Sequence, residues 1–163
     1  MKLYHGSVVE VRKPSLRQGR DRTDFGKGFY TTTLLEQAEH WAIIKRDRAK
    51  AEKAIVSVYE IDDTFLNDPT LLKREFIGVD ESWLKFVVNC RTENSSKHDF
   101  DIVFGPVAND NVFTTVNLYE TGVLDAQAAI IQLRAYQTYN QLSFHTERVI
   151  NALKFVESFV VTS

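Results

Sequence analysis

The stretch FGKGFYTT, residues 25–32, is the part of the sequence that most strongly constrains the fold. Its two glycines, Gly26 and Gly28, allow a tight turn, because a residue without a Cβ atom can take backbone angles that other residues avoid. The residues 29–32 that follow are aromatic or β-branched, which is typical of a strand. The stretch therefore predicts a glycine-containing turn that leads directly into a short strand.

A helix is predicted directly after this strand, from about residue 34 to residue 52. Thr33 and Glu36 have the spacing of a capping box, in which a hydroxyl and a carboxylate satisfy the first free N–H groups of a helix. Apolar residues then recur at the spacing of one helix face, at Leu34, Ala38, Trp41 and Ala42.

Short strands and helices alternate irregularly along the rest of the chain. Strands are predicted at residues 2–5, 54–61, 100–106, 141–144 and 158–162. Helices are predicted at residues 82–90, 110–121, 125–137 and 147–156. This order does not repeat a strand–helix–strand unit, so an α+β fold is expected rather than a parallel α/β sheet.

One domain spanning residues 1–163 is expected. The chain is 44% hydrophobic and has no linker rich in proline or glycine. No apolar run approaches the ~18 residues needed to cross a bilayer, so no membrane contact and a cytoplasmic location are expected. Cys90 is the single cysteine, and neither it nor the histidines have the spacing of metal ligands, so no metal site is expected.

Positive charge gathers in the N-terminal third, although the formal net charge of the chain is −2. Part of it lies at residues 45–53 of the predicted helix, where solvated basic residues need no ligand. Another group lies on the irregular segment before the first glycine-rich strand, where an anion can be clamped. This group comprises Arg12, Lys13, Arg17, Arg20, Arg22 and Lys27.

Three segments far apart in the sequence place polar or aromatic residues on or beside predicted strands. The first is YHGS at residues 4–7, the second is the stretch 25–32, and the third is YNQLSF at residues 139–144. Each motif alone is common, since glycines mark many turns and polar residues often flank strands. Their order along the chain is the informative feature.

In this order the segments resemble the ADP-ribosyltransferase superfamily, in the branch of diphtheria-toxin-like toxins and poly-ADP-ribose polymerases. His5-Gly6-Ser7 matches the first-strand motif of that branch, and residues 26–30 match its second motif. The whole chain also resembles a bacterial family of uncharacterised, DUF3990-like domains. The resemblance implies an α+β fold with an ADP-ribosyltransferase-like split β-sheet core and inserted helices.

The resemblance also implies that NAD is bound as co-substrate, without a metal, and that its nicotinamide–ribose bond is broken. It assigns the nicotinamide to the backbone of Gly6 and to the rings of Tyr30 and Trp41, which would stack on it. His5, Tyr30 and Gln141 are the expected catalytic residues. His5, Tyr30, Trp41 and Gln141 are therefore expected to surround one cleft.

The remainder of the NAD molecule would be held by polar residues. His5, assisted by Ser7, would bind the adenosine-side ribose. Arg20 or Arg22 could hold the diphosphate through bidentate contacts, and the resemblance does not choose between them.

Gln141 is where the sequence departs from the family, which has a catalytic Glu at this place. A carboxylate would stabilise a ribosyl cation by its charge, whereas an amide offers only neutral hydrogen bonds. Restoring the charge by Gln141→Glu is therefore expected to raise NAD cleavage.

Two functions stay open at this point. The first is mono-ADP-ribosylation of an unidentified protein or nucleic-acid acceptor by a toxin-like effector, with an antitoxin protein as a further expected partner. The second is a catalytically weak module that binds NAD or ADP-ribose.

Overall fold

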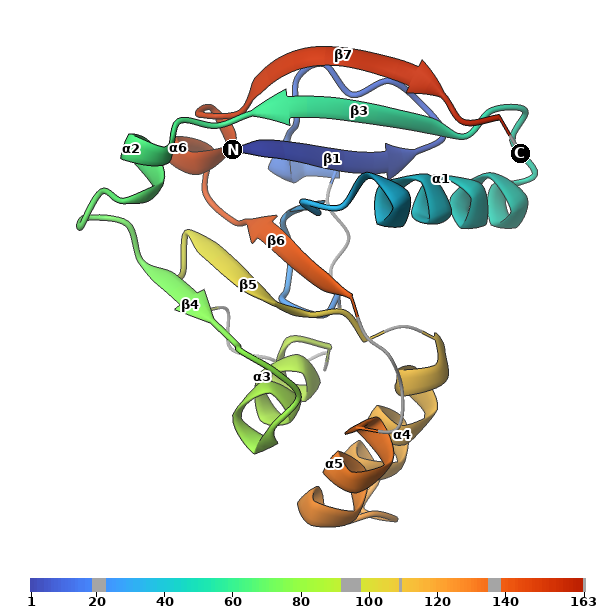
Figure 1. Cartoon of the computed structure of the whole chain (residues 1–163). Coiled ribbons are helices and arrows are strands. Elements are labelled where there is room, and N and C mark those ends of the chain that lie inside the picture. The colour runs from blue at the N-terminus through green and yellow to red at the C-terminus, as the bar shows by residue number, and fades with distance from the viewer. Residues whose placement is uncertain (19–22, 92–97, 109, 135–138, 163) are drawn as a thin grey trace.

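The computed structural model describes residues 1–18, 23–91, 98–108, 110–134 and 139–162, and its strands form two sheets (Figure 1). The upper sheet has three strands in the order β1-β3-β7, and the lower sheet has four in the order β2-β6-β5-β4. β4 runs parallel to β5, and the other pairs are antiparallel. The strands are β1 (Lys2–Ser7), β2 (Phe29–Thr31), β3 (Ile55–Glu60), β4 (Lys73–Glu75), β5 (Ile102–Pro106), β6 (Asn140–Phe144) and β7 (Lys154–Val160).

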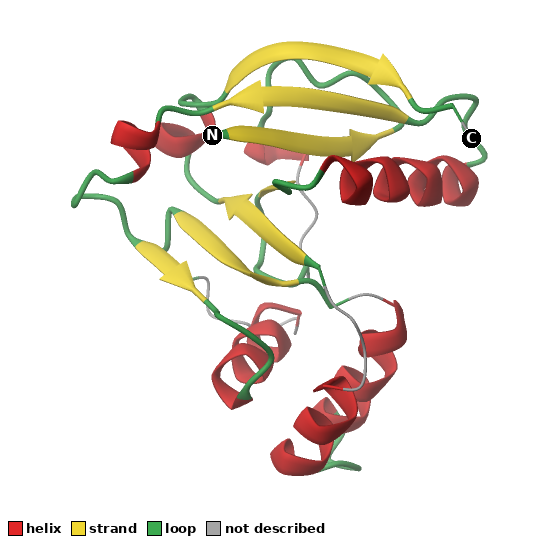
Figure 2. Cartoon of the chain, viewed as in Figure 1, coloured by secondary structure: helices red, strands yellow, loops and turns green. Residues whose placement is uncertain are grey.

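Helices flank these sheets, and the expected α+β class is confirmed (Figure 2). α1 lies along β1 of the upper sheet, whereas α3, α4 and α5 gather below the lower sheet. The helices are α1 (Leu35–Ala49), α2 (Asp63–Leu66), α3 (Glu81–Arg91), α4 (Asp110–Glu120), α5 (Ala126–Arg134) and α6 (Glu147–Ile150), and a 3-10 turn, η1, lies at Leu16–Gln18. Within the described ranges, no helix is long and apolar enough to cross a membrane.

The two sheets meet where β1 passes the end of β2. Tyr4 and Thr32 form an antiparallel bridge there, with N–O distances of 2.9 Å and 3.0 Å for the two backbone hydrogen bonds. Because paired residues of neighbouring strands point to the same side, this bridge shows which side chains of the upper sheet and of the lower sheet lie on the same face.

Helix α1 approaches β1 closely because residue 6 is a glycine. A Cβ atom on Gly6 would lie 2.2 Å from the carbonyl oxygen of Ala38 and 2.8 Å from the backbone nitrogen of Ala42. Both are backbone atoms of α1 and cannot swing aside. Close packing of helix on strand therefore accounts for Gly6 without any ligand.

The predicted capping box at Thr33 and Glu36 is wrong. Leu34 occupies the N-cap position and makes no side-chain capping bond. Instead, the Thr32 hydroxyl accepts a hydrogen bond from the Leu34 backbone N–H at 3.1 Å. The hydroxyl one residue earlier is available because Thr32 is already fixed by its bridge to Tyr4.

The predicted helix at residues 147–156 is also wrong. Only Glu147–Ile150 are helical, and Lys154–Val160 form β7, which pairs with β3 from Ile55↔Val160 to Glu60↔Lys154. Backbone hydrogen bonds to a strand nearly a hundred residues earlier replace the local bonds of a helix. The short elements α2 and β4 were not predicted, since three or four residues carry little periodic signal.

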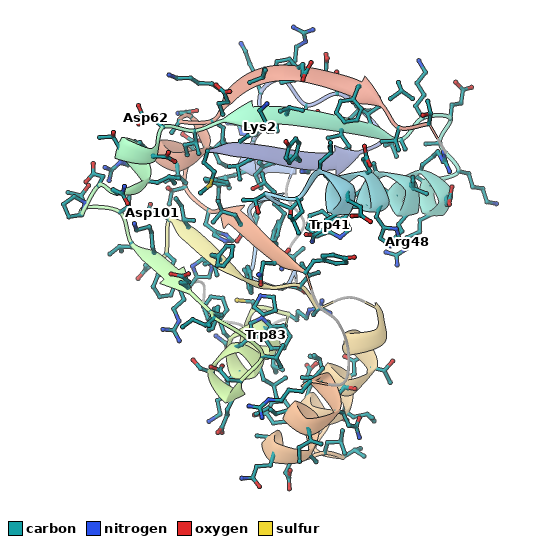
Figure 3. All side chains as sticks on the ribbon, in the orientation of Figure 1. Lys2, Trp41, Arg48, Asp62, Trp83 and Asp101 are labelled. Carbon is teal, nitrogen blue, oxygen red and sulfur yellow. The ribbon has the colours of Figure 1, made fainter. Side chains whose placement is uncertain are left out.

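Buried side chains form three clusters around the sheets. One lies between the sheets and includes Leu3, Phe29, Tyr59 and Phe144. A second lies between the lower sheet and α3–α5 and includes Phe25, Trp83 and Val103 (Figure 3). The third lies under α1 and includes Ala38, Ala42, Val56 and Val58.

Candidate functional site

Gly6, Tyr30 and Gln141 share one face of the joined sheets. Tyr30 lies opposite Ser143 in the β2–β6 register, and Gln141 is two residues from Ser143, so the side chains of Tyr30 and Gln141 point the same way. Gly6 is two residues from Tyr4, which bridges Thr32 beyond the end of β2. The strand register alone therefore brings residues of all three sequence motifs to one surface.

Trp41 stands beside this face, between two contacts that anchor α1. One turn before it, Gln37 accepts a hydrogen bond from the Thr32 hydroxyl at 2.8 Å. One turn after it, Lys45 donates from Nζ to the Gly6 carbonyl at 2.7 Å. Residues four apart lie on the same side of a helix, so the partly exposed indole of Trp41 lies over the junction of β1 and β2 (Figure 3).

His5 is placed on the opposite face of the strands. Its ring stacks on Phe29 with the ring centroids 4.4 Å apart, and its Nδ1 lies 2.7 Å from the Tyr30 carbonyl oxygen. A carbonyl can only accept, so Nδ1 carries the proton. Burial, together with a smaller effect of the nearby Lys45 charge, lowers the pKa of His5 to about 3. His5 is thus a neutral support behind β2, and its proposed contact with a ribose stays a prediction.

The Tyr30 hydroxyl is held by the turn at residues 23–26. It accepts from the Phe25 N–H at 3.0 Å, lies 2.5 Å from the Gly26 carbonyl oxygen and lies 2.8 Å from the Thr23 hydroxyl. Burial raises the pKa of Tyr30 far above its ordinary value. Tyr30 therefore stays protonated, and its partly exposed ring is the part that a ligand can meet.

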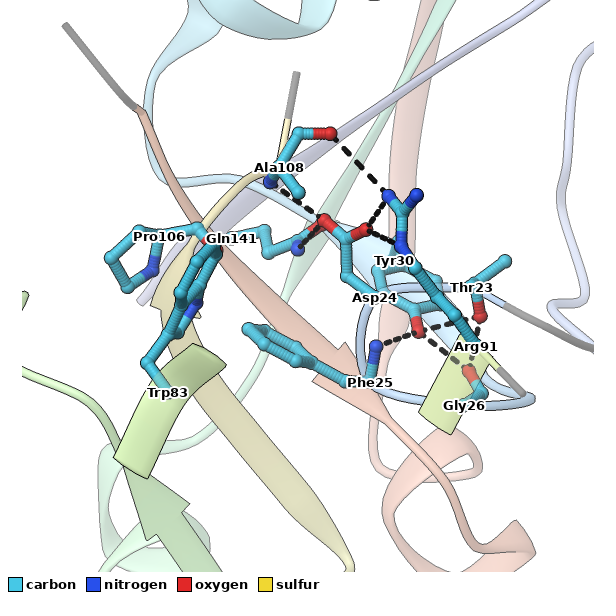
Figure 4. Close-up of polar contacts among 10 residues, drawn as sticks. All are labelled: Thr23, Asp24, Phe25, Gly26, Tyr30, Trp83, Arg91, Pro106, Ala108 and Gln141. Atoms are coloured by element: carbon cyan, nitrogen blue, oxygen red, sulfur yellow. Dashed lines mark hydrogen bonds and ion pairs between the residues drawn. The ribbon is translucent and has the colours of Figure 1, made fainter. Parts of the chain in front are cut away.

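Gln141 is buried at 4% exposure, and its amide binds a carboxylate that the sequence motifs did not identify. Its Nε2 donates to Oδ2 of Asp24 at 3.0 Å. Asp24 also accepts the backbone N–H of Ala108 at 2.8 Å. Arg91, at the end of α3, binds Oδ1 of Asp24 through Nε at 3.0 Å and also through Nη2 (Figure 4).

Asp24 and Arg91 are the site residues that sequence reasoning missed. Asp24 lies one residue before the stretch 25–32, and Arg91 lies on a helix predicted only for its packing. A carboxylate in a loop followed by glycines has many ordinary uses, so no sequence signal distinguished it. Its 7% exposure and its four hydrogen-bond donors become visible only in the fold.

The other amide atom of Gln141, its oxygen, is not used in the contact with Asp24. Among the described residues, Oε1 of Gln141 has no hydrogen-bond partner, whereas Nε2 of Gln37 is the single buried side-chain polar atom found without one. The amide thus presents its N–H groups to Asp24, and its oxygen is the atom left to accept a hydrogen bond from another donor.

Two histidines hold the glycine turn against the lower sheet. His98 Nε2 lies 2.7 Å from the Phe25 carbonyl oxygen, and His145 Nδ1 lies 2.8 Å from the Lys27 carbonyl oxygen. The two rings meet edge to face at 4.5 Å. His145 thus fastens this turn, and a Cβ on Gly28 would lie 2.6 Å from its Nδ1.

The other predicted residues contribute less to this geometry. Arg20 and Arg22, the candidates for the diphosphate, lie outside the described residues. Ser7 ends β1 and is partly exposed. Arg12 pairs with Glu10 at 2.7 Å and lies over the Phe155 ring, so it packs on the surface of the upper sheet. No cluster of three or more potential metal ligands occurs in the part of the chain that the structure describes.

A pocket of about 480 Å³ lies on the other flank of α1. Gln37, His40, Tyr139 and Phe159 are among the residues that line it, and none of the predicted site residues does. The face of Gly6, Tyr30 and Gln141 lies beside Trp41 and is separate from this pocket.

These features define an α+β protein in which two sheets meet at a polar junction crossed by one helix. Residues 1–155 match the family described as "Protein of unknown function (DUF3990)", and the chain belongs to this family. No curated protein and no solved structure matches it.

Proposed function

We propose that this protein is an NAD-dependent mono-ADP-ribosyltransferase. The observation that carries the proposal is the common face of Gly6, Tyr30 and Gln141, with Trp41 over the junction of the sheets. The first two motifs that resemble ADP-ribosyltransferases lie within residues 4–32, and the third lies more than a hundred residues later in the chain. Their meeting at one surface supports a shared role in binding one ligand.

The reaction breaks the bond between the nicotinamide nitrogen and C1′ of the ribose. The bonding electron pair leaves with nicotinamide, an oxygen or nitrogen of the acceptor bonds to C1′, and the acceptor loses a proton. The site must hold a planar leaving group and stabilise the positive charge that develops on the ribose.

The residues present fit these requirements in part. Trp41 offers a partly exposed indole for stacking on a planar ring. Gln141 offers Oε1 as an acceptor for a ribose hydroxyl and as a partial negative charge near the cation. Lys45 occupies one lone pair of the Gly6 carbonyl, so the second lone pair is the one left for the nicotinamide amide.

The acceptor is a protein or a nucleic acid in this proposal, and a partner protein that blocks access to this face would act as an antitoxin. A second candidate function is a module that binds NAD or ADP-ribose without cleaving it. The observation that favours it is the neutral Gln141, whose amide is held by Asp24 in place of a carboxylate at residue 141.

The test is to incubate the protein with NAD labelled in its adenosine part, together with bacterial cell extract. Release of nicotinamide and transfer of label to protein or nucleic acid support the transferase. Stabilisation by NAD without nicotinamide release supports the binding module, since a ligand at a hundredfold excess over its Kd adds about 2.7 kcal/mol. Neither effect at millimolar NAD would reject both functions.

Trp41→Leu gives the site-specific version of this test. Loss of the indole removes the stacking surface, so NAD binding is expected to weaken about tenfold while the fold is kept. His40→Gln, on the neighbouring exposed surface of α1, is the matched control and leaves binding unchanged.

A further inference from the structure

We infer that Asp24 is a positioning residue that fixes the amide of Gln141 with its oxygen toward the ligand face. An ionised carboxylate has only acceptor sites, so its hydrogen bond with Gln141 must use the amide N–H groups. The 3.0 Å contact between Nε2 and Oδ2 therefore selects one of the two amide orientations. Without Asp24, the side-chain oxygen and nitrogen of Gln141 could exchange places.

Asp24 can impose this orientation because it is itself held from two other sides. Arg91 binds Oδ1, and the Ala108 N–H binds Oδ2 at 2.8 Å. The side chains of Asp24 and Arg91 are 9% and 16% exposed, so water competes little for these bonds. Donors from α3 and from the segment after β5 thus hold the carboxylate in place. The carboxylate in turn fixes the side chain of Gln141 on β6.

The same contact gives Gln141 part of the character of a carboxylate. A negative charge at the N–H end of an amide polarises it and strengthens its oxygen as an acceptor. Residue 141 itself has no negative charge, but Asp24, which accepts the hydrogen bond from its amide, has one. Arg91 balances this charge, so the outward effect is an oriented dipole rather than a full charge.

This arrangement also defines what Gln141 can bind. Oε1 accepts and cannot donate, so the group that meets it must be a donor such as a hydroxyl of a sugar. A phosphate or carboxylate oxygen of a ligand would be repelled. This consequence rests on the proposed function, whereas the orientation of the amide rests on contacts within the protein.

The orientation is tested first in the protein without ligand, by NMR of the Gln141 side-chain NH2 group. Its resonances are assigned by their disappearance in Gln141→Met. Asp24→Asn is expected to shift them strongly, because the charged acceptor is lost. Asp101→Asn is the control, since Asp101 accepts from the Leu72 N–H at 2.9 Å and from the Thr146 hydroxyl at 2.7 Å. Unchanged Gln141 resonances in Asp24→Asn would overturn the inference.

Nicotinamide release then tests the consequence. Asp24→Asn is expected to lower kcat about tenfold or more, with KM for NAD changed less than about threefold, because the oriented oxygen acts mainly on the developing charge. The double variant Asp24→Asn/Gln141→Glu returns a carboxylate to residue 141 and an amide donor to residue 24, so release is expected to recover. A double variant as slow as Asp24→Asn would show a merely structural role and would contradict the inference.

Two further outcomes separate the two proposals. If the NMR shift occurs but neither the parent nor any variant releases nicotinamide, the transferase fails and the positioning by Asp24 stands. Should Asp24→Asn fail to fold because Arg91 loses its counter-charge, Asp24→Asn/Arg91→Gln removes both charges and gives the same NMR readout.

Discussion

Asp24 and Arg91 lie 67 positions apart in the sequence and form an ion pair beneath the candidate site, with Arg91 Nε 3.0 Å from Asp24 Oδ1. Both side chains are largely buried. Removing two charges from water costs several kcal/mol per ion, so such a pair gives little net stability but becomes costly when one partner is lost. Removing one partner of the pair should therefore cause a loss of stability that is large enough to measure.

Arg91→Met is expected to lower the free energy of unfolding by about 3–5 kcal/mol, because it leaves the Asp24 carboxylate buried without its counter-charge. Denaturant unfolding followed by circular dichroism measures the change. Arg148→Met is the control, because Arg148 pairs with Asp68 at 3.0 Å with side chains 45% and 36% exposed, and exposed pairs contribute at most about 1 kcal/mol. Equal losses in the two variants would contradict the burial argument.

Gln141→Glu, expected from the sequence alone to raise NAD cleavage, is now expected to destabilise the protein. The new carboxylate would stand beside Asp24, where Nε2 now lies 3.0 Å from Oδ2, and two buried carboxylates at this distance cannot both ionise. The loss is expected to be about 1–3 kcal/mol at neutral pH and to shrink as the pH falls and one carboxylate is protonated. Gln127→Glu, exposed on α5, should cost nothing measurable. A stable and more active Gln141→Glu would show that residue 141 does not contact Asp24.

Gly6→Ala separates packing from ligand binding at the first motif. The added Cβ would collide with backbone atoms of Ala38 and Ala42 at 2.2 Å and 2.8 Å, so a loss of about 3 kcal/mol in unfolding free energy is expected without any ligand. Gly78→Ala is the matched control, since a Cβ there meets nothing within 4 Å. A Gly6→Ala protein with unchanged thermal stability but lost NAD binding would assign Gly6 to the ligand instead.

Acidic pH is expected to lower the free energy of unfolding, because His145 takes up a proton more readily in the unfolded chain than in the folded protein. Burial, together with a small effect of His98, lowers the pKa of His145 to about 4, against an ordinary value of 6.5. The unfolded chain therefore binds the proton at higher pH than the folded protein does, and stability falls as the pH drops from about 6.5 toward 4. The loss assigned to His145 is on the order of 2 kcal/mol. Unfolding measured across this range should be less pH-dependent in His145→Gln than in the parent, with exposed His40→Gln as control. Parallel slopes for the parent and His145→Gln would refute the role of His145.

The sequence by itself determined the elements whose stability is local. Residues 35–49 and 81–91 form helices as their periodic apolar residues predict, because each backbone bond joins residues four apart. Gly122, at φ 82°, follows α4, and Asp125 accepts the Ala128 N–H at 2.8 Å at the start of α5, so both helix ends are fixed by nearby residues. The order of the three motifs along the chain could also be read from the sequence, because it does not depend on the fold.

Only the tertiary structure decided which distant residues meet. Lys154–Val160 became a strand because β3 offered a free edge, and no local pattern contains that information. Asp24, Arg91 and Gln141 converge because a turn, a helix end and a strand are packed together by unrelated apolar contacts. The resemblance therefore pointed to Gln141 as a missing charge, whereas the fold placed a carboxylate one hydrogen bond behind it. Hydrogen bonds across such sequence distances depend on the packing of the whole chain, which is why they cannot be read from local sequence.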